Sequence, residues 1–340
     1  MSGVLHLLRL SGTASIQDGG RPGFLRDGLS ASGPMDRLAH AAANHLVGNP
    51  PDAAAIELGL ASATLRVEGG PVRLALAGAC GPLHCDGEPL ADHRAFLLRE
   101  GAALTLGRPR AGMFATLAVA GSFSLRPVLG SVALHRRAAL GGLDGRPLRE
   151  GDRLPIAGPA PAGEADSCLD PVPLESDRPI RVVLGPQDDL FPPEGLATFL
   201  QGTFTVSGQA DRMGYGLDGP AIAHGEGGFN IVSDATVTGS VQVPGTGRPI
   251  VLMADRQTTG GYPKIATVIS ADLRRIAQRR PGEPVRFEAV DLATARQLAQ
   301  ARAATLDALS RNLRPVEGEA ERLMAANLAG AAVDALRAED

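Results

Sequence analysis

Between residues 72 and 119 the chain contains four short apolar runs, Val72-Arg73-Leu74-Ala75-Leu76-Ala77, Ala95-Phe96-Leu97-Leu98, Ala103-Leu104-Thr105-Leu106 and Ala115-Thr116-Leu117-Ala118-Val119. Segments rich in Gly, Pro, Asp and Glu separate these runs, and such segments form turns. Short apolar runs at this spacing are typical of strands in a β-sandwich or β-barrel. The 43 glycines and 26 prolines among 340 residues also predict many turns. We therefore predict a mainly β protein with short helices.

The sequence on both sides of this stretch divides the chain into segments. A strand is expected at residues 5–10. A helix is expected near residues 34–47, because Pro34 suits the first helical position and Gly48 follows the last apolar residue. Residues 155–179 hold six prolines and predict a linker. We expect a β-rich domain over residues 1–154, a second over residues 180–290 and a helical tail over residues 291–340.

The second half shows its own strand and helix signals. Pro193 begins an expected short helix, and Asp272 with the two residues before it caps another. Strands are expected at residues 180–184, 203–206, 231–232, 241–243, 250–253 and 285–289. Apolar residues at helical spacing on both sides of Pro315 predict two tail helices that dock on the body or on a partner.

The overall composition excludes several classes of protein. Apolar residues make up 44% of the chain, charged residues 21%, and the net charge is −4, an ordinary balance for a soluble globular protein. No basic run suits nucleic acid, no apolar stretch has the length of a membrane helix, and the first ten residues lack an export signal. Three cysteines suggest reduced thiols. We expect a cytoplasmic protein that binds neither nucleic acid nor a membrane.

Familiar cofactor and metal motifs are absent from the sequence. It contains no G-x-x-x-x-G-K-[ST] loop for ATP and no H-E-x-x-H or paired C-x-x-C zinc motif. Cys80, His84 and Cys85 lie close together, but three soft ligands in one tight loop fit ordinary burial better than a metal. We predict no metal site, and no cofactor bound through a recognisable motif of this chain.

Lys264 is the only lysine among 33 basic residues. A lysine ammonium is a compact charge whose pKa shifts readily on burial, whereas arginine stays charged. Lys264 ends a dense polar run, Asp255-Arg256-Gln257-Thr258-Thr259-Gly260-Gly261-Tyr262-Pro263-Lys264. Two explanations remain open. Either the ammonium does something that arginine cannot do, or this run is a polar surface loop in a chain where lysine is scarce for codon reasons.

Three further polar clusters accompany the lysine run. One holds Gln17, Asp18 and Arg21, and a second holds Ser32 and Asp36 at the start of the expected helix, where free amides favour an anion. The third combines Gln187 and Asp188 with Ser207, Asp211, Arg212 and Met213. Together the clusters suit a small polar substrate that is handled by acid/base groups, donors and an anion site. Singly, each is also explained by surface ion pairs and turns.

Taken together, the motifs resemble those of the KipA-type family. This family comprises the 5-oxoprolinase C subunits and the carboxyltransferase region of urea carboxylase, also labelled allophanate hydrolase subunit 2. The resemblance extends over about residues 5 to 290. It is carried by Gln17-Asp18-x-Gly-Arg21, Ser32-Gly-x-Met35-Asp36, Asn44 to Asn49, Glu57, Gly185-Pro-Gln187-Asp188, Asp211-Arg212-Met213-Gly214-Tyr215, Val241-Gln242-Val243-Pro244-Gly245 and the run from Asp255 to Lys264.

The resemblance implies a cyclophilin-like β-barrel architecture and a role in a multi-protein enzyme. It implies a KipI-like partner (the B subunit of 5-oxoprolinase), a LamB/YcsF-like partner (its A subunit), and ATP-dependent opening of 5-oxoproline to glutamate. The alternatives are carboxyl transfer from carboxybiotin to urea or a related amide, and a non-catalytic protein that antagonises a KipI-like partner. Since Lys264 lies in Tyr-Pro-Lys and not in a biotinylation motif, ATP or carboxybiotin is expected through other chains of the complex.

The sequence departs from the usual pattern of that family in four places, one of them a pair of residues. Cys80 and Gly216 stand where an aspartate and an arginine are usual, and Asp234 stands where a glutamate is usual. Ala133-Leu134 replaces a pair of hydroxyl residues. These changes remove charge and hydroxyl groups from polar clusters, so a changed substrate or a purely binding role is an alternative to the usual activity.

We expect the four clusters to converge around Lys264. Lys264 and Arg256 are the candidate cations for a substrate carboxylate or a developing oxyanion, and Asp18 and Asp211 are the candidate acid/base carboxylates. The candidate substrate-binding residues are Gln17, Arg21, Ser32, Asp36, Gln187, Arg212, Gln242, Thr258, Thr259 and Tyr262. The competing interpretation is that the Asp-Arg pairs at residues 211–212 and 255–256 only staple barrel loops, because ion-pair networks mimic active sites.

Overall fold

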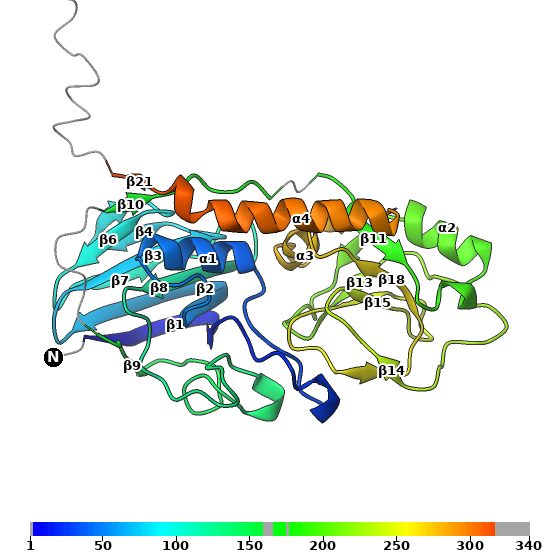
Figure 1. The fold of residues 1–340 in the computed structure, drawn as a ribbon, viewed down its shortest axis with the longest axis horizontal. Coiled ribbons are helices and arrows are strands. Elements are labelled where there is room, and N and C mark those ends of the chain that lie inside the picture. Colours follow the sequence, from blue (N-terminus) through cyan, green and yellow to red (C-terminus); the bar gives the residue numbers. More distant parts are fainter. Residues whose placement is uncertain (1–2, 159–165, 175–176, 317–340) are drawn as a thin grey trace, which may run out of the picture.

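The computed structural model describes residues 3–158, 166–174 and 177–316 and shows two β-rich bodies side by side (Figure 1). The prediction of a mainly β fold with barrel architecture is confirmed. The first body is a nine-stranded sheet in the order β5-β4-β7-β2-β8-β3-β6, with β1 pairing both β2 and β9. Its strands are β1 Val4–Gln17, β2 Ala55–Glu68, β3 Val72–Gly78, β4 Leu83–Cys85, β5 Glu88–Leu90, β6 Ala95–Leu98, β7 Ala103–Leu106, β8 Phe114–Val119 and β9 Arg153–Pro155.

The longest pair in this sheet is the antiparallel β1–β2 hairpin, which runs from Val4 opposite Glu68 to Gln17 opposite Ala55. The strand expected at residues 5–10 therefore continues seven residues further, to Gln17. Two register shifts explain the extension, because a β-bulge lets a strand bend without ending. Gly12, at the second shift, has a φ of 94°, a conformation that glycine adopts at no steric cost.

Helix α1, Arg37–Leu46, packs on β3 and β8 of this sheet. It begins three residues later than the expected position near residue 34. The reason is Asp36, whose carboxylate accepts hydrogen bonds from the backbone amides of Leu38 and Ala39 and so caps the helix. The helix buries alanines against the alanines of β3 and β8, a small-residue contact that brings helix and sheet close together.

His40 of α1 makes stability depend on pH. Burial lowers the pKa of its imidazole to about 4, while its Nε2 donates to Ala53 O at 2.9 Å. An unfolded histidine titrates near 6.5, so between pH 6.5 and 4 the unfolded chain binds more protons. The free energy of unfolding should therefore fall by about 3 kcal/mol from this residue as the pH drops through that window. A His40→Gln chain should lose this part of the slope in urea denaturation at several pH values, and an unchanged slope would contradict the assignment.

The second body is an eight-stranded sheet in the order β19-β12-β13-β16-β15-β18-β11-β20. Its two ends, β19 and β20, are consecutive in the sequence, so the sheet curls into a nearly closed barrel. Buried aromatic residues, among them Phe199, Phe204 and Tyr215, fill the interior. The strands are β11 Ile180–Leu184, β12 Phe204–Val206, β13 Gly214–Asp218, β15 Ser240–Gln242, β16 Ile250–Leu252, β18 Lys264–Val268, β19 Pro284–Val285 and β20 Phe287–Ala289.

Short elements complete the barrel. The expected helix at Pro193 is confirmed as α2, Pro193–Gln201, and the expected helix after Asp272 is α3, Leu273–Ala277. The side chain of Asp272 does not cap α3 but pairs with Arg181 and Arg275. A two-stranded ribbon, β14 (Asp234–Ala235) with β17 (Thr259–Gly260), takes the place of the strand expected at residues 231–232.

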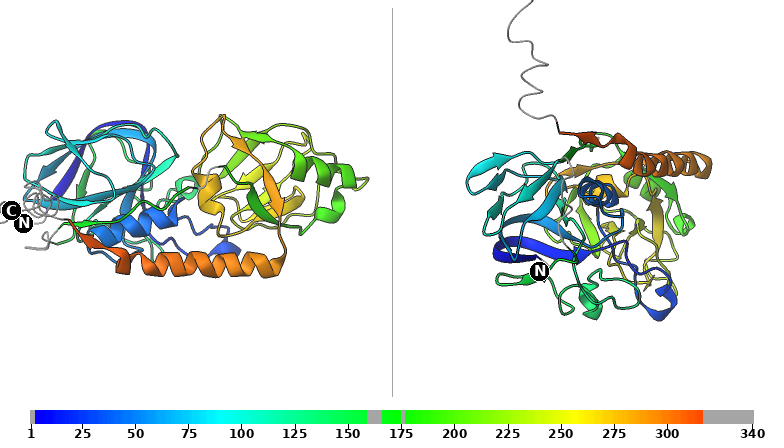
Figure 2. Two further views of the ribbon diagram at one scale, coloured as in Figure 1. Left: turned by 90° about the horizontal axis from the view of Figure 1, so that it is seen from above. Right: turned by 60° about the vertical axis from the view of Figure 1, so that its left-hand side comes forward.

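The predicted linker and tail lie against each other. Ser167–Cys168 of the linker (β10) pairs with Arg314–Pro315 of the tail (β21). Between them and the barrel, helix α4, Leu292–Ala308, extends along one side of both bodies (Figures 1 and 2). The second predicted tail helix lies outside the described residues. Within residues 3–158, 166–174 and 177–316, no helix combines the length and the hydrophobicity that a membrane span requires.

The two bodies are tied together at α1, α3 and β8 by buried side chains. Gln278, just beyond α3, accepts hydrogen bonds from the amides of Met113 and Phe114. It donates to Phe114 O and to Asp36 Oδ2, 2.7 Å away. Arg274 of α3 also donates to Asp36 Oδ2, at 2.9 Å. All four hydrogen bonds of the Gln278 side-chain amide cross the junction between the two bodies. They use its full capacity on both the oxygen and the nitrogen, and so fix the orientation of the amide there.

Candidate functional site

The Lys264 ammonium lies inside the second body, not in bulk solvent. Lys264 is the first residue of β18, and only 2% of the residue is exposed. Its Nζ donates to Asp234 Oδ2 at 2.7 Å, and no other side chain of the described residues is seen to bind it. An ammonium has three N–H donors, so two remain for a ligand. A buried lysine in this setting is a candidate functional group.

Asp234 and Gln187 form the polar wall beside this ammonium. The Gln187 side chain accepts from the Lys264 amide at 3.1 Å and donates to Asp234 Oδ2 at 3.0 Å. Hydrogen bonds from Lys264 and Gln187 hold the pKa of Asp234 below its usual value. The Asp234 side chain is 47% exposed, so its carboxylate separates the ammonium from solvent. A ligand carboxylate or oxyanion would replace Asp234 there with the same charge.

Gln242 joins the lysine to the rest of its sequence motif. It lies opposite Lys264 in the β15–β18 pair, and its Oε1 accepts from Gln257 Nε2 at 3.0 Å. Gly260 of the ribbon makes this arrangement possible, because a Cβ at that position would lie 2.4 Å from Gln242 Nε2. The ribbon therefore lies directly on the Gln242 amide. Tyr262, two residues after Gly260, is 41% exposed.

Arg256 is a second buried cation of the same motif. Its guanidinium donates to Thr238 Oγ1 at 3.0 Å and to Thr236 O at 3.3 Å, both neutral oxygens. Its Nε has no partner within the part of the chain that the structure describes, and no ion pair with a carboxylate is formed there. Burial lowers the pKa of Arg256. A buried guanidinium held only by neutral acceptors is well suited to meet an anionic ligand.

A separate cluster around Arg212 lies between the two bodies. Arg212 donates to both oxygens of Asp255 at 2.9 Å, to Glu57 Oε1 and to Gly33 O at 2.8 Å. Burial works against the charge of Arg212, but Glu57 and Asp255 outweigh it and raise its pKa. Burial also raises the pKa of Glu57, whose Oε2 accepts from the Met35 amide at 2.6 Å. These charges satisfy one another, so the cluster joins the bodies.

Gln17, Asp18 and Arg21 of the first body hold a loop, and none of their hydrogen bonds goes to Lys264. Asp18 accepts from Ser131 Oγ at 2.6 Å, from the Val132 amide at 2.7 Å and from the Gly20 amide at 2.8 Å. Arg21 donates only to backbone carbonyls, including Ala133 O at 2.6 Å, and burial lowers its pKa. Gln17 donates to Leu134 O at 3.3 Å. Both oxygens of Asp18 are thus already occupied by backbone and hydroxyl donors.

The remaining predicted residues are divided among these clusters. Asp211 is exposed and accepts from the amides of Met213 and Gly214, which closes a turn. Asp36 caps α1 and meets α3, and the buried Ser32 has a φ of 56°. Thr258 and Thr259 belong to the ribbon segment beside Gln242. Among the described residues, Gln187 contacts Lys264 and Gln242 lies opposite it in the sheet, whereas Asp255 of the same run pairs with Arg212. The convergence of all four clusters on Lys264 stays a prediction.

Asp234 and Glu57 are absent from the predicted site residues. In the sequence Asp234 stands out only as a departure from the usual glutamate, yet it is the direct partner of the ammonium. Glu57 stands out only as part of a motif, and it is fully buried against Arg212. A buried lysine needs an acidic partner, so the sequence could have prompted a search for a nearby Asp or Glu. It could not show that this partner is Asp234, because Asp234 lies 30 residues away and is brought to Lys264 by the tertiary fold.

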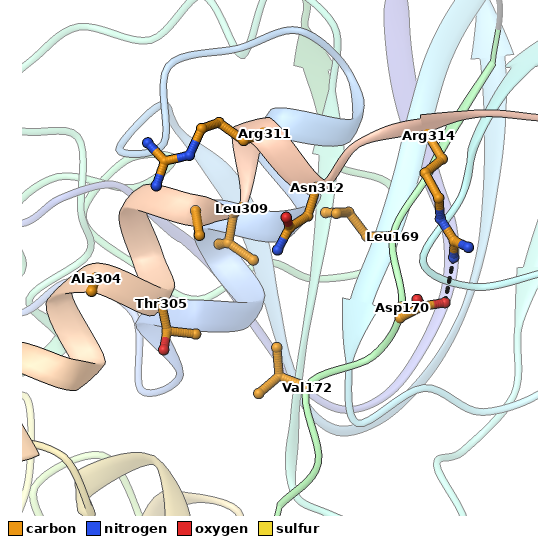
Figure 3. A pocket seen from close by; sticks show the side chains of 10 residues that line it. Leu169, Asp170, Val172, Ala304, Thr305, Leu309, Arg311, Asn312 and Arg314 are labelled. Atoms are coloured by element: carbon orange, nitrogen blue, oxygen red, sulfur yellow. Dashed lines mark hydrogen bonds and ion pairs between the residues drawn. The ribbon is translucent and has the colours of Figure 1, made fainter.

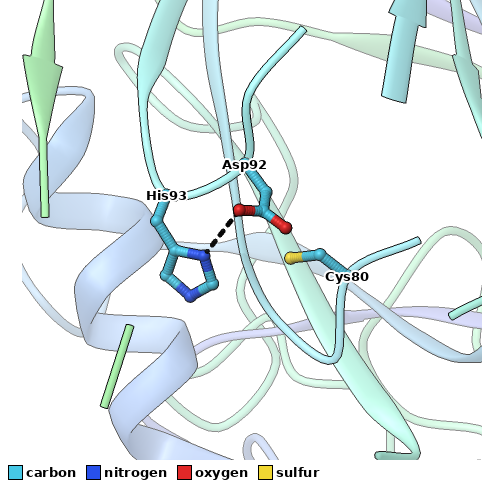
Figure 4. A group of neighbouring side chains, drawn as sticks. All are labelled: Cys80, Asp92 and His93. Atoms are coloured by element: carbon cyan, nitrogen blue, oxygen red, sulfur yellow. Dashed lines mark hydrogen bonds and ion pairs between the residues drawn. The ribbon is translucent and has the colours of Figure 1, made fainter. Parts of the chain in front are cut away.

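In the sequence Cys80 is close to His84 and Cys85, but in the structure its nearest potential metal ligands are other residues. Its thiol lies with Asp92 and His93, and their ligand atoms lie within 4.8 Å of one another (Figure 4). The Gly78 amide donates to His93 Nε2 at 3.2 Å, so the neutral ring carries its proton on Nδ1, which faces Asp92. A metal at Nδ1 would require that proton to leave, and burial raises the pKa of the Cys80 thiol. These three residues therefore fit a hydrogen-bonded structural cluster better than a metal centre.

An open pocket of about 690 Å³ separates the linker from the end of α4. Leu169 and Val172 of the linker face Leu309, and Asp170 pairs with Arg314 at 2.5 Å (Figure 3). Both members of that ion pair are exposed, so it adds little to stability. The lining holds no cluster of acid/base groups. We therefore interpret this pocket as a gap in the packing between the linker and the tail, and not as a catalytic site.

The chain is similar to proteins of known families over most of its length. A family model described as carboxyltransferase domain, subdomain A and B, matches residues 27–289. The 5-oxoprolinase C subunit of Haemophilus influenzae is 36% identical over 308 residues, which cover 91% of this chain and 98% of that protein. The 5-oxoprolinase C subunit of Escherichia coli is 38% identical over 284 residues, 84% of this chain and 90% of that protein.

A solved structure shares the same fold. The crystal structure of the K. lactis urea amidolyase matches with a TM-score of 0.82 and 26% identity, over 90% of this chain and 20% of that protein. The resemblance inferred from the motifs is thereby confirmed. Because the family model spans most of the described chain and two relatives are more than a third identical, this chain belongs to the carboxyltransferase domain, subdomain A and B, family.

Proposed function

We propose that this chain is the C subunit of an ATP-dependent 5-oxoprolinase. We also propose that a group of five residues, Lys264, Asp234, Gln187, Gln242 and Arg256, which we call the Lys264 cluster, binds the substrate. Two relatives, each named as the C subunit of a 5-oxoprolinase, are 36% and 38% identical and are matched over nearly their whole length. The observation that carries the proposal is the buried ammonium of Lys264, which keeps free N–H donors beside a replaceable carboxylate. The overall reaction consumes 5-oxoproline, ATP and two molecules of water, one added to the ring amide and one to ATP, and forms glutamate, ADP and phosphate.

The cluster offers each group that a small cyclic amide with a carboxylate requires. Lys264 would hold the developing negative charge on the amide oxygen, since a donor at a low-dielectric site stabilises such charge strongly. Arg256 would bind the substrate carboxylate in place of the neutral oxygens that it contacts now. The side chains of Gln187 and Gln242 would orient the ring amide, and Tyr262 would cover it from the solvent side.

Other parts of the reaction belong to other chains in this proposal. Two partner proteins, one KipI-like and one LamB/YcsF-like, would complete the enzyme in the cytoplasm and handle ATP. In this scheme Asp18 and Asp211 keep structural roles, because their carboxylates already accept backbone amides. The acid/base group would then come from Asp234 or from a partner chain.

Reconstitution tests the proposal. The chain is mixed with its KipI-like and LamB/YcsF-like partners, and glutamate formation from 5-oxoproline is followed with and without ATP. We expect ATP-dependent glutamate formation that disappears when any one of the three proteins is omitted. Omission of each partner in turn is the matched control for a contaminating activity. Formation of glutamate without this chain would contradict its role in the enzyme.

Carboxyl transfer to urea or a related amide is the second candidate, favoured by the structural match to a urea amidolyase. In that case the mixture would consume urea in a biotin-dependent reaction and leave 5-oxoproline unchanged. A set that co-purifies with the KipI-like partner but turns over neither compound would instead support the non-catalytic antagonist. The three outcomes are distinct, so one set of assays separates them.

A further inference from the structure

A cavity of about 690 Å³ opens between the two bodies, and its lining includes none of Lys264, Asp234, Gln187 and Gln242. Its walls are the β1–β2 hairpin of the first body and the loop with Arg212 of the second. Its volume lies within the range of about 300–1,000 Å³ that is usual for sites enclosing sizeable small molecules. It is therefore much roomier than a five-membered ring with one carboxylate requires.

Three arginines line this cavity without an acidic partner. Arg136 and Arg137 belong to the single-turn helix η2, Arg136–Ala138, and Arg108 lies in the loop before β8. All three are exposed, and none forms an ion pair or a side-chain hydrogen bond within residues 3–158, 166–174 and 177–316. Arg212, by contrast, is already neutralised by Glu57 and Asp255. The exposed Asp211 also lines the cavity, and within the described part of the chain its Oδ1 accepts only the amides of Met213 and Gly214. Three unpaired arginines therefore face one such carboxylate, and the excess charge available to a ligand is positive.

The rest of the lining is mostly apolar. Phe114 and Leu134 are buried, and Leu60, Met113 and Met213 are half-buried at the same surface. Gly59 keeps the wall flat, because a Cβ there would lie 2.5 Å from Thr13 Oγ1 and 3.1 Å from the Phe114 ring. An apolar floor beside unpaired cations is complementary to a molecule with a hydrocarbon body and one anionic end.

We infer that this cavity is a second binding site, for an organic anion whose apolar body is larger than 5-oxoproline and whose head is a carboxylate or phosphate. The head lies against Arg136, Arg137 and Arg108, and the body lies on Phe114, Met113 and Leu134. The inference uses none of the residues of the Lys264 cluster. It therefore stands or falls independently of the proposed function.

Calorimetric titration of the full chain with octanoate, octyl phosphate and neutral octan-1-ol tests the site. We expect both anions to bind, and octan-1-ol to bind at least about tenfold more weakly, because it lacks the charge-assisted contacts. An Arg136→Ala/Arg137→Ala chain should bind the anions at least about tenfold more weakly. An Arg99→Ala chain, altered at an exposed arginine of the β6–β7 turn, is the matched control and should bind as the wild type does.

Each result decides the question. Tighter binding of octanoate assigns a carboxylate head, and tighter binding of octyl phosphate assigns a phosphate head. Equal binding by the neutral alcohol, unchanged binding by the double variant, or no binding of either anion at millimolar concentration would overturn the inference. If the double variant has lost its native circular dichroism, Arg108→Ala replaces it, with the same expected direction.

Discussion

A Lys264→Met chain, reconstituted with its partner proteins, is expected to lose at least about a hundredfold in kcat for 5-oxoproline. Methionine has nearly the volume of lysine, so the buried space at the start of β18 stays filled. What disappears is the ammonium that would hold the charge developing on the amide oxygen. ATP-dependent glutamate formation is measured, and thermal unfolding of the isolated chain shows that the fold is retained.

Two further variants distinguish a chemical role from a merely structural one. Lys264→Arg keeps the charge but places a larger planar group where only 2% of the residue is exposed, so activity should still fall. Asp234→Glu keeps the carboxylate and should retain most of the activity, because the ion pair re-forms on an exposed ribbon. Turnover of Lys264→Arg equal to that of the wild type would refute the role assigned to the ammonium.

An Arg212→Met chain is expected to be destabilised by about 3–5 kcal/mol, the usual cost of removing one member of a buried ion pair. Glu57 and Asp255 would then be buried without a counter-charge. Burial raises the pKa of Glu57 and the charge of Arg212 lowers it, so the pKa rises further when Arg212 is removed. Stability held by a raised carboxyl pKa is lost as the pH rises, and the deficit should be smaller at pH 5 than at pH 8.

An exposed pair supplies the control for that experiment. Arg248 and Asp218 form an ion pair at 3.1 Å with more than half of each side chain exposed. An Arg248→Met chain should therefore lose at most about 1 kcal/mol. Urea denaturation of the two variants, followed by circular dichroism, gives both numbers. Similar losses in both chains would show that burial does not set the strength of the Arg212 cluster.

Much of the fold follows from local sequence signals. The apolar runs at residues 72–77, 95–98, 103–106 and 115–119 form β3, β6, β7 and β8 within one residue of the expected bounds. Elements with weak local signals are not predicted. β13 is rich in glycine and has only Tyr215 and Leu217 buried, so its pairing with β12 and β16 supplies what its own residues do not. The bulged extension of β1 is likewise stabilised by β2.

The residue types of the candidate site are predictable, but their grouping is not. The run from Asp255 to Lys264 is one polar segment, as expected, but its two ends contribute side chains to two different clusters. Asp255 faces Arg212 at the junction, whereas Lys264 faces Asp234 in the barrel. Which way each side chain points depends on the close approach of Gly260 to Gln242 and on the register shift between β15 and β18. Neither can be derived from residue types alone.

The four hydrogen bonds of the Gln278 amide at the junction of the two bodies bear on how a ligand could reach the Lys264 ammonium. A hinge motion between the two β bodies at this point would have to break the hydrogen bonds of a fully bonded buried amide, which opposes such a motion. The ribbon of β14 and β17 has only two residues in each strand and carries an exposed carboxylate. Its Asp234 carboxylate lies between the Lys264 ammonium and solvent, so a ligand that reaches the ammonium from that side has to displace this carboxylate.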